Sequence, residues 1–550
     1  MTGSSGYAPP AFVGAIRLDL SKNEGRAPCG LDLIRSVAGL SELARYPDLK
    51  ELQSALAATY GVSAERVLVT AGADDALLRL CLLQLRRTNG EAKKRALVAA
   101  PTFEMIPRYV GVAGGDLVTV PWPSGAFPTD ALLAAASEHT SLVVVVSPNN
   151  PTGAIATYAD VARIARGLPN ACVVLDAAYA EYGGEDLVSE VQRLPNVVVV
   201  RTLSKAWGLA GLRVGCAIAS ADVLQQLHAA GNPMPVSIAS ARLAVRWLQT
   251  GRDYVAAHVA WVCQKRVELA RRLRCLGVAP SEPCQGNFLL VRGVRPEWLT
   301  RALAAFGIAV RRFPGQADLR DAVRIGVPSE QGGYDELVAA LEVVLAPQAL
   351  LFDMDGVLAD VTASYRQAIV QTAASFGVVV TPADVTAAKA RGDANDDWQL
   401  TRSLMAARGV SRDLAEVVAQ FERRYEQLRD GERLLVAAEQ LRGWRRRMPL
   451  AVVTGRPREQ AEYFLAQFEI RDLFDAVVCR EDAALKPDPA PVKLAMERLG
   501  VRSAWMLGDT IDDLDAARGA GALPIGVGSQ LIEQRAACVL TRSADVEGGL

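Results

Sequence analysis

The stretch TLSKAWGLAGLRVG, residues 202–215, holds a single lysine, Lys205, next to the hydroxyl of Ser204 and a run of small residues. Arg213 follows eight positions later. A lysine amine that is desolvated in a pocket becomes a nucleophile able to form a Schiff base with a carbonyl compound. Most lysines are surface charges, so the meaning of Lys205 depends on the residues that accompany it.

Other predicted strand ends supply polar partners for this amine. VLVTAGADDALLRL (67–80) predicts a strand, a glycine turn and a helix, and such a turn aims backbone N–H groups at an anion. Taken alone, it would be an ordinary tight turn. VVVVSPNNPTG (143–153) and ACVVLDAAYAEY (171–182) predict two more strands, and parallel sheets bind ligands beyond the carboxyl ends of their strands. The polar or anion-binding residues of these stretches and of 202–215 are Ala73, Asp74, Asn150, Asp176, Tyr179, Ser204 and Arg213.

An anion cradle, an amine, a carboxylate, a phenol and an amide are together what pyridoxal phosphate needs. Its aldehyde takes the lysine amine, and a carboxylate keeps the pyridine nitrogen protonated so that the ring is an electron sink. Donor groups hold the phenolic oxygen of the ring. The first half of the chain therefore predicts a pyridoxal-phosphate enzyme.

This half resembles the aspartate aminotransferase-like fold, with its large and small domain, and within it the histidinol-phosphate aminotransferase family. The resemblance covers about residues 15–346. It rests on motifs that occur in the order of the family: LSKNEG, RYPD, GADD, PTFEM, SPNNPTG, LDAAY, TLSKAWGLAGLR, NFLLVR and VRIGV.

The resemblance implies a role for each matching residue. Lys205 is the Schiff-base lysine and proton shuttle, Asp176 pairs with the pyridine nitrogen, and Arg324 grips the anionic end of the substrate. Other cofactor contacts are to the phenolic oxygen (Asn150, Tyr179), the ring face (Phe103, where the family often has tyrosine) and the phosphate (Ala73, Asp74, Ser204, Arg213). Tyr46 reaches the cofactor phosphate of the neighbouring subunit, which implies a homodimer.

Two motifs depart from the family pattern. NEGR stands at residues 23–26 where the family often reads NENP, and this segment lines the substrate pocket. DAAY replaces the common DEAY. The first departure leaves the identity of the substrate open, while neither touches the cofactor chemistry.

A second stretch, ALLFDMDGVLAD (349–360), sends an apolar strand into Asp353 and Asp355. Strand side chains alternate, so both carboxylates lie on one face, where they repel unless a cation or a shared proton relieves them. Alone, this would be an acidic turn. Further along, LAVVTGRP, AALKPDP and AWMLGDTIDDLDAA add Thr454, Lys486, Asp509, Asp512 and Asp513. Acidic groups at two strand ends form an oxygen-rich site suited to Mg²⁺.

These motifs resemble the four motifs of the haloacid dehalogenase-like hydrolases over about residues 349–540. The resemblance implies that Asp353 attacks phosphorus, and that Asp355 protonates the leaving alcohol and then activates water. Thr454 and Lys486 bind the phosphoryl oxygens. Mg²⁺ is bound by Asp353, the Asp355 carbonyl and Asp509, and is supported by Asp513. An acid at Asp355 favours a phosphatase over a dehalogenase.

The domain organisation follows from these motifs. Both halves are predicted to be α/β with parallel sheets. The first domain is expected over 1–346 and the second, Rossmannoid domain over 347–550. The core of the second domain is expected over 347–361 and 440–550, with a helical cap at about 362–439. Within the cap, RGDANDDW (391–398) is either a specificity loop or an exposed turn between helices.

Composition limits the remaining functions. A net charge of −1 gives no basic field for nucleic acid or an anionic membrane, and the arginine run in LRGWRRRMPL (441–450) is expected to be a solvated helix face. The longest apolar runs are too short to span a bilayer, and no signal-peptide pattern opens the chain. Nine unpatterned cysteines suggest buried thiols in a cytoplasmic protein. The three histidines, none beside a motif, argue against zinc, Ser-His or Cys-His catalysis.

The two halves suggest consecutive reactions of histidine synthesis. The aminotransferase would convert imidazole acetol phosphate to histidinol phosphate with glutamate as donor, and the phosphatase would release histidinol. Three alternatives stay open: an aminotransferase–phosphatase pair of specialised metabolism, a catalytically silent regulatory second domain, and a decarboxylase acting on a phosphorylated amino acid. Fold alone does not choose among substrates.

Overall fold

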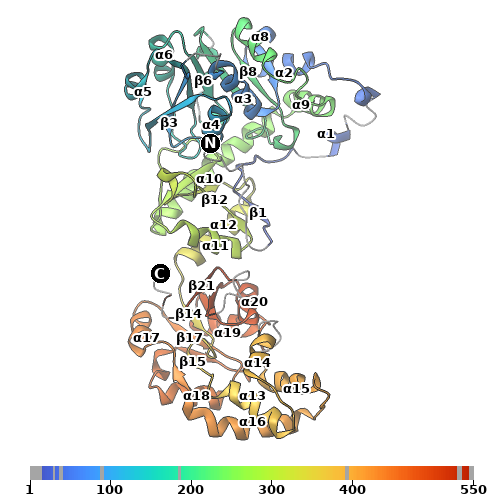
Figure 1. The fold of residues 1–550 in the computed structure, drawn as a ribbon, viewed down its shortest axis with the longest axis vertical. Helices are drawn as coiled ribbons and strands as arrows, with labels where there is room; N and C mark the ends of the chain where they lie inside the picture. The colour runs from blue at the N-terminus through green and yellow to red at the C-terminus, as the bar shows by residue number, and fades with distance from the viewer. Residues whose placement is uncertain are drawn as a thin grey trace. The chain divides into compact units, whose positions relative to one another are not determined.

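Two packing units make up the chain, each with its own sheet and hydrophobic core (Figure 1). The first consists mainly of Asp19–Pro296 and Val310–Asp335, and the second of Glu336–Leu550 with the short segment Glu297–Ala309. This division falls inside α12 (Gln331–Leu345), so the domain boundary near residue 347 stays a prediction. The computed structural model describes residues 15–28, 31–35, 41–86, 92–183, 187–191, 193–389, 396–528, 536–543 and 545.

The first unit is built on a seven-stranded sheet. In spatial order the strands are β2 (Val67–Thr70), β8 (Gly215–Ile218), β7 (Val197–Thr202), β6 (Cys172–Asp176), β5 (Thr140–Val146), β3 (Arg95–Ala100) and β4 (Asp116–Pro121). All neighbouring pairs are parallel except those of β8, which is antiparallel to both β2 and β7. The prediction of a parallel sheet is therefore correct for the centre and wrong for β8. The valine-rich central strands are buried on both faces, as in sheets covered by helices.

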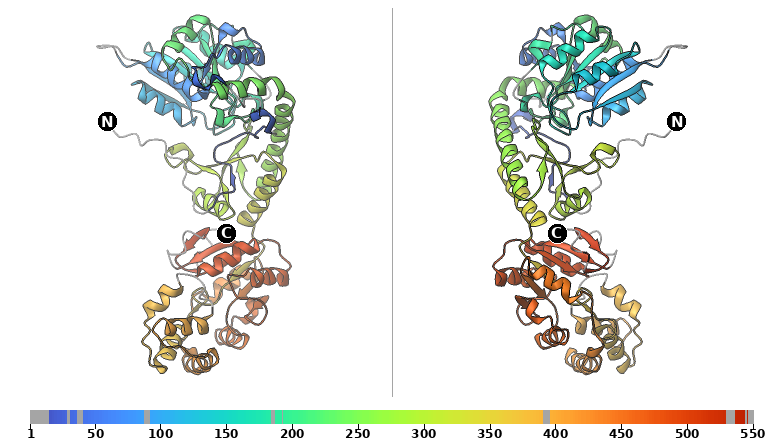
Figure 2. Two further views of the ribbon diagram at one scale, coloured as in Figure 1. Left: turned by 90° about the vertical axis from the view of Figure 1, so that its right-hand side faces the viewer. Right: turned by 90° about the vertical axis from the view of Figure 1, so that its left-hand side faces the viewer.

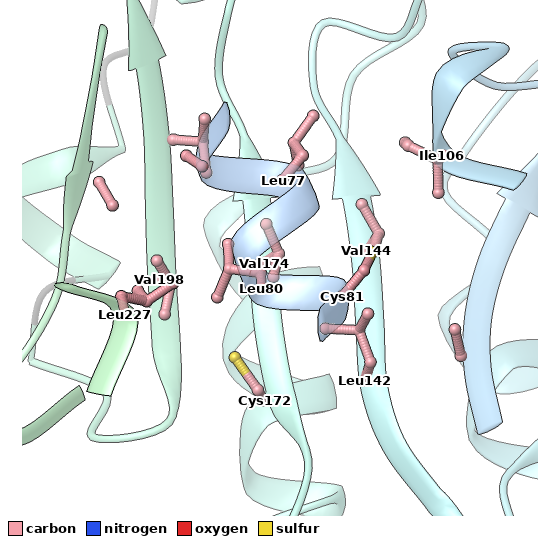
Figure 3. Packing of buried hydrophobic residues seen from close by; sticks show 14 of the residues in the cluster. Leu77, Leu80, Cys81, Ile106, Leu142, Val144, Cys172, Val174, Val198 and Leu227 are labelled. Atoms are coloured by element: carbon pink, nitrogen blue, oxygen red, sulfur yellow. The ribbon is translucent and has the colours of Figure 1, made fainter. Parts of the chain in front are cut away.

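Helices cover this sheet, and α3 packs directly on its central strands. Figure 3 shows Leu77, Leu80 and Cys81 of α3 among Val144 and Val174 of the strands, within one buried cluster. The helices of this part are α1 (Leu31–Arg35), α2 (Lys50–Tyr60), α3 (Gly72–Leu85), α4 (Met105–Val112), α5 (Thr129–Ala135), α6 (Tyr158–Gly167), α7 (Val188–Val191), α8 (Ala221–Ala229) and α9 (Ile238–Thr250).

A second, four-stranded sheet is antiparallel, which corrects the expectation of parallel sheets throughout. It pairs Arg324 with Leu290 of the neighbouring strand and so places Arg324 on an inner strand. In spatial order its strands are β12 (Arg311–Arg312), β13 (Val323–Gly326), β10 (Phe288–Arg292) and β9 (Ala279–Pro280). The remaining elements before the second sheet are β1 (Leu18–Asp19), β11 (Ile308–Ala309), α10 (Arg252–Cys275) and α11 (Pro296–Ala305).

The second unit has a six-stranded, fully parallel sheet, as predicted. In spatial order its strands are β18 (Ala476–Val478), β17 (Leu450–Val453), β14 (Leu350–Phe352), β19 (Trp505–Gly508), β20 (Leu523–Val527) and β21 (Cys538–Leu540). Its helices are α17 (Ala438–Arg445), α18 (Arg458–Gln467), α19 (Ala490–Leu499) and α20 (Ile511–Ala520). In α17 Arg442 and Arg445 are exposed while Trp444 is buried, so the arginine run is a solvated face.

Four helices lie in the chain between β14 and β17, in the segment expected to be the cap (yellow to orange in Figures 1 and 2). We call them the cap, and their role over the site stays a prediction. They are α13 (Tyr365–Ser375), α14 (Pro382–Lys389), α15 (Asp397–Ala406) and α16 (Leu414–Leu428). A two-stranded antiparallel connector, β15 (Ala359–Asp360) with β16 (Arg433–Leu434), joins them to the core. Residues 390–395, which include most of the predicted specificity loop, lie outside the described residues.

None of the helices among the described residues is long and apolar enough to cross a membrane. The eight described cysteines form no disulfide. Five of them are buried, but Cys275 is exposed, so the expectation of buried thiols fails there.

Two candidate active sites

A cavity of about 190 Å³ lies at the carboxyl ends of the large sheet in the first unit. Every residue predicted for the cofactor or substrate of this half lines it, except Tyr46. The lining residues that were predicted are Ala73, Asp74, Phe103, Asn150, Asp176, Tyr179, Ser204, Lys205, Arg213 and Arg324.

Lys205 sits just beyond the end of β7, against the segment that begins at Ser21. Its Nζ donates to the Lys22 carbonyl at 3.0 Å and lies 5.6 Å from the centre of the Tyr179 ring. A Cβ at Gly25 would come within 1.8 Å of the Lys205 carbonyl oxygen, so only glycine allows this approach. The early segment therefore closes directly onto the lysine loop.

Asn23 is a site residue for which sequence reasoning gave no role. It is buried with φ of 54°, in the left-handed region, and its Nδ2 donates to the Tyr179 hydroxyl at 3.2 Å. The sequence offered one signal, because Asn23 begins the NEGR segment that was predicted to line the substrate pocket. No contact of Asn23 itself was predicted. Asn23 orients the phenol that is expected to face the ring of the cofactor.

Asp176 ends β6 as a buried carboxylate. Its Oδ1 accepts from the Ala178 backbone N–H at 3.2 Å. Burial raises the pKa of Asp176 to about 7, against the opposing effect of that hydrogen bond and of the Lys205 charge. A buried acid of this kind favours a cationic partner, such as a protonated ring nitrogen.

An anion cradle forms where α3 begins. A Cβ at Gly72 would lie 2.7 Å from Arg213 NH2, so the glycine lets the guanidinium reach the start of the helix. Arg213 itself donates to Ser204 Oγ at 3.3 Å and to Asp74 Oδ2 at 3.5 Å. The unpaired N–H groups of a helix N-terminus, a guanidinium and a hydroxyl together suit a phosphate.

Two arginines line the opposite side of the cavity. Arg324 donates through NH1 to Asn150 Oδ1 at 2.6 Å and through NH2 to the Ser21 carbonyl. Arg311 NH2 donates to Glu104 Oε1 at 2.6 Å. Arg311 and Glu104 were not predicted, although Glu104 lies in the PTFEM motif beside Phe103.

Tyr46 is 85% exposed and lies away from the cavity of its own chain. Its predicted contact with the cofactor of a neighbouring subunit, and the homodimer, stay predictions. The other residues fit pyridoxal phosphate, because an amine, a buried acid and an anion cradle surround one cavity large enough for a ring.

The second site lies where three neighbouring strands of the six-stranded sheet end. Asp353 follows β14, Thr454 follows β17 and Asp509 follows β19. These residues, with Asp355, line a cavity of about 30 Å³. The structure thus brings together groups that lie more than 150 positions apart.

Lys486 is the buried cation of this site. Its Nζ lies 2.5 Å from Asp353 Oδ1 and 2.5 Å from Asp513 Oδ1, and it donates to the Val453 carbonyl at 3.1 Å. Thr510, the N-cap of α20, donates from Oγ1 to the other oxygen of Asp513 at 2.6 Å. Asp513 is therefore held from both sides.

Asp353, Asp509 and Asp513 form a group suited to a metal ion, with one oxygen of each within 4.8 Å of the others. Burial raises the pKa of Asp353 well above its usual range and that of Asp509 to about 7, and the neighbouring carboxylates add to both shifts. A Cβ at Gly356 would lie 2.2 Å from Asp509 Oδ2, so a glycine preserves this space. Three crowded hard oxygens fit Mg²⁺, whose charge would relieve their repulsion.

The Asp355 carboxylate stands apart from that group and contacts Arg456 Nε at 2.6 Å. Only the carbonyl of Asp355 was expected to bind metal, and no finding tests that expectation. Arg456 was not predicted, although it stands two residues after Thr454 in the same TGRP motif.

Charged and aromatic groups from the cap, together with Arg480 after β18 of the core, add to the wall of this cavity. Lys389 Nζ lies 3.1 Å from Asp397 Oδ1, and the Arg480 guanidinium lies 3.9 Å from the centre of the Trp398 ring. Asp397 and Trp398 end the predicted specificity loop, whereas Lys389 and Arg480 had no signal in the sequence.

Fold and sites define an enzyme with a pyridoxal-phosphate type of transferase fold and a second, hydrolase domain. The family model for aminotransferase class I and II matches residues 20–341, and that for haloacid dehalogenase-like hydrolase matches residues 347–521. The chain belongs to the class I and II aminotransferases and carries a haloacid dehalogenase-like hydrolase domain after them.

Similar proteins cover different shares of the chain. A histidinol-phosphate aminotransferase of Ruegeria pomeroyi is 35% identical over 335 residues, covering 57% of this chain and 88% of that protein. The crystal structure of histidinol-phosphate aminotransferase from Sinorhizobium meliloti, in complex with pyridoxal-5'-phosphate, has a TM-score of 0.54 and 27% identity, covering 62% of this chain and 97% of that one. An imidazoleglycerol-phosphate dehydratase of Phytophthora nicotianae is 47% identical over 194 residues, 33% of this chain, which spans only 43% of that relative.

Proposed function

We propose that this protein is a bifunctional enzyme that makes and then dephosphorylates a phosphorylated amino alcohol. The first site would transfer an amino group from glutamate to imidazole acetol phosphate, and the second would hydrolyse the resulting histidinol phosphate to histidinol. The observation that carries the proposal is the presence of both complete residue sets, each around its own cavity, on one chain.

The named relatives support the substrate. One is called a histidinol-phosphate aminotransferase and another an imidazoleglycerol-phosphate dehydratase. The compound in each name is a phosphate monoester of an alcohol that carries an imidazole ring. An enzyme pair that passes on such a phosphate ester fits the order of the two domains.

In the first site, bound pyridoxal phosphate would supply an aldehyde and an electron-accepting ring. Lys205 would hold it through its side-chain amine and would carry a proton to and from the reacting carbon of the substrate. Asp176 would stay beside the ring nitrogen, and Arg324 would grip the anionic end of the substrate. The side chains left to hold the phenolic oxygen, ring face and phosphate are Asn150, Tyr179, Phe103, Ser204 and Arg213.

In the second site, a bound Mg²⁺ would neutralise charge on the phosphoryl group. A carboxylate oxygen of Asp353 would attack phosphorus while the bond to the alcohol breaks, and Asp355 would give that alcohol its proton. Asp355 would then take a proton from the water that hydrolyses the phosphoaspartate. Thr454 and Lys486 would hold the phosphoryl oxygens, and Asp509 and Asp513 the metal ion.

A direct test incubates the protein with histidinol phosphate. Glutamate formation from 2-oxoglutarate and, separately, Mg²⁺-dependent phosphate release are the expected results. If other phosphorylated amines react and histidinol phosphate does not, the proposed substrate is wrong. Release of CO₂ from a phosphorylated amino acid would instead indicate the decarboxylase.

Assembly and location belong to the same proposal. We expect a homodimer in which Tyr46 completes the site of the partner subunit, and the exposure of Tyr46 supports that. The absence of disulfides among the eight described cysteines supports a reducing compartment such as the cytoplasm.

A further inference from the structure

Arg456 is a guanidinium buried beside the second site, only 2% exposed. Its Nε donates to Asp355 Oδ1 at 2.6 Å. On its other edge, NH1 and NH2 donate to the two carboxylate oxygens of Glu432 at 2.9 and 3.1 Å. Burying a guanidinium destabilises a protein unless its donors are satisfied, and here two carboxylates satisfy them.

The groups on the outer edge of Arg456 come from the chain segments that join cap and core. Glu432 directly precedes β16 of the connector. It accepts a hydrogen bond at 2.7 Å from Oγ of Ser364, the residue directly before α13. Tyr425, near the end of α16, contacts Arg456 NH1 at 3.3 Å, and the Tyr365 ring lies 4.6 Å from its guanidinium carbon. The chain segment that enters the cap and the segment that leaves it therefore both lie next to this arginine.

We infer that Arg456 is a positioning residue that fixes the Asp355 carboxylate for proton transfer, and that Glu432 holds Arg456 in place from the cap connector. This inference rests on the proposed phosphatase function. With Oδ1 engaged by Arg456, the second oxygen of Asp355 is the one left to exchange a proton with the leaving alcohol and then with water. Because Glu432 lies in the connector, the orientation of Asp355 depends on the cap being seated on the core.

The choice of substrate separates this role from a general role in folding or phosphate binding. A nitrophenyl phosphate has a leaving group that is stable as an anion, so its departure needs no proton, whereas attack of water on the phosphoenzyme still needs Asp355. Histidinol phosphate, an alkyl ester, needs a proton in both steps. A defect transmitted through Asp355 therefore slows the second step for both esters but the first step only for histidinol phosphate.

The test is rapid-mix kinetics of Arg456→Met on the full protein with Mg²⁺. With p-nitrophenyl phosphate we expect a burst of about one nitrophenol per site followed by turnover slowed by about 10²–10³-fold, the scale of a lost acid–base group. KM should fall together with kcat, because the first step is kept and hydrolysis of the phosphoenzyme limits turnover. With histidinol phosphate no burst of alcohol should appear, because the first step also needs a proton from Asp355. Asp355→Asn should reproduce this pattern, and Glu432→Gln should show it in weaker form.

Arg458→Met is the matched control, because Arg458 lies two residues further on and pairs with Asp482 and Glu462 outside the cavity. It should turn over like the unchanged protein. Arg456→Met with normal thermal stability but no burst with p-nitrophenyl phosphate, or with unchanged kinetics, would overturn the inference. If that variant does not fold, Arg456→Lys and Glu432→Gln decide by the same readout. If the unchanged protein releases phosphate from neither ester, the phosphatase proposal fails and this inference with it.

Discussion

At the scale of single residues, each site buries acidic groups that its own cations do not fully balance. Asp176 is a buried acid whose pKa is raised to about 7, and in the second site the one amine of Lys486 lies between the carboxylates of Asp353 and Asp513. Burial of charge without a matching partner is unfavourable, so both arrangements favour a bound ligand of the missing charge.

The first prediction concerns the amine. Lys205→Ala should abolish the visible absorbance change that pyridoxal phosphate causes on binding, because no other amine on the cavity wall occupies that position. Lys22→Ala is the control, since Lys205 donates to the backbone carbonyl of Lys22, which this substitution keeps. A retained absorbance shift in Lys205→Ala would contradict the role of this lysine.

The second prediction concerns Asp176 and pH. A folded-state pKa of about 7 means that the folded protein keeps a proton which the unfolded chain, with an ordinary pKa of about 3.9, has already released. The stability contributed by that proton is complete at low pH and is lost as pH rises from about 4 to about 7. The thermal midpoint of the cofactor-free first unit should therefore fall over this range more steeply than in Asp176→Asn. Equal slopes for the two proteins would rule out the raised pKa.

The third prediction concerns the nucleophile. Asp353→Asn should stop phosphate release from histidinol phosphate, because an amide is a poor nucleophile and cannot neutralise Lys486 as the carboxylate does. Transamination should continue at the normal rate. Measuring both activities on one preparation distinguishes a local defect from misfolding, in which both would fall.

At the scale of elements, the strand ends position the chemistry. β14, β17 and β19 are neighbours in a parallel sheet, so the residues that follow them meet at one edge. In the other unit, α3 packs its apolar face on β5 and β6 and so fixes the anion cradle at its first turn. Packing of this helix therefore supports both stability and cofactor binding.

The fourth prediction belongs to α3. Leu80→Ala removes a side chain that is 1% exposed, and such changes destabilise by about 2–5 kcal/mol through lost contacts and a cavity. Val112→Ala, at a position that is 70% exposed, should change stability by less than about 0.5 kcal/mol. Denaturant unfolding of the first unit measures both. Similar effects for the two variants would show that α3 does not pack as described.

At the scale of the whole molecule, two sheets with separate cores carry two separate chemistries. The residues of each site come entirely from one packing unit. Ligands that bind only the folded form stabilise the unit that they bind.

The fifth prediction follows from that separation. Thermal unfolding should show two transitions, with pyridoxal phosphate raising one midpoint and Mg²⁺ the other. Removing divalent ions with EDTA should abolish phosphate release and leave transamination intact. A single transition raised by both ligands would contradict independent units.

The sequence by itself determined the α/β class, the two families and the polar residues proposed to act on cofactor, metal and substrate. Motifs such as SPNNPTG and FDMDG are local, and a local pattern reports both the strand and the chemistry at its end. Only the tertiary structure decided the antiparallel pairing of β8, the contact of Asn23 with Tyr179 and the link from Asp355 through Arg456 to Glu432. Those contacts depend on which distant segments pack together. Asn23 and Tyr179 are 156 positions apart and Asp355 and Arg456 are 101 apart, so no local sequence pattern predicts their hydrogen bonds.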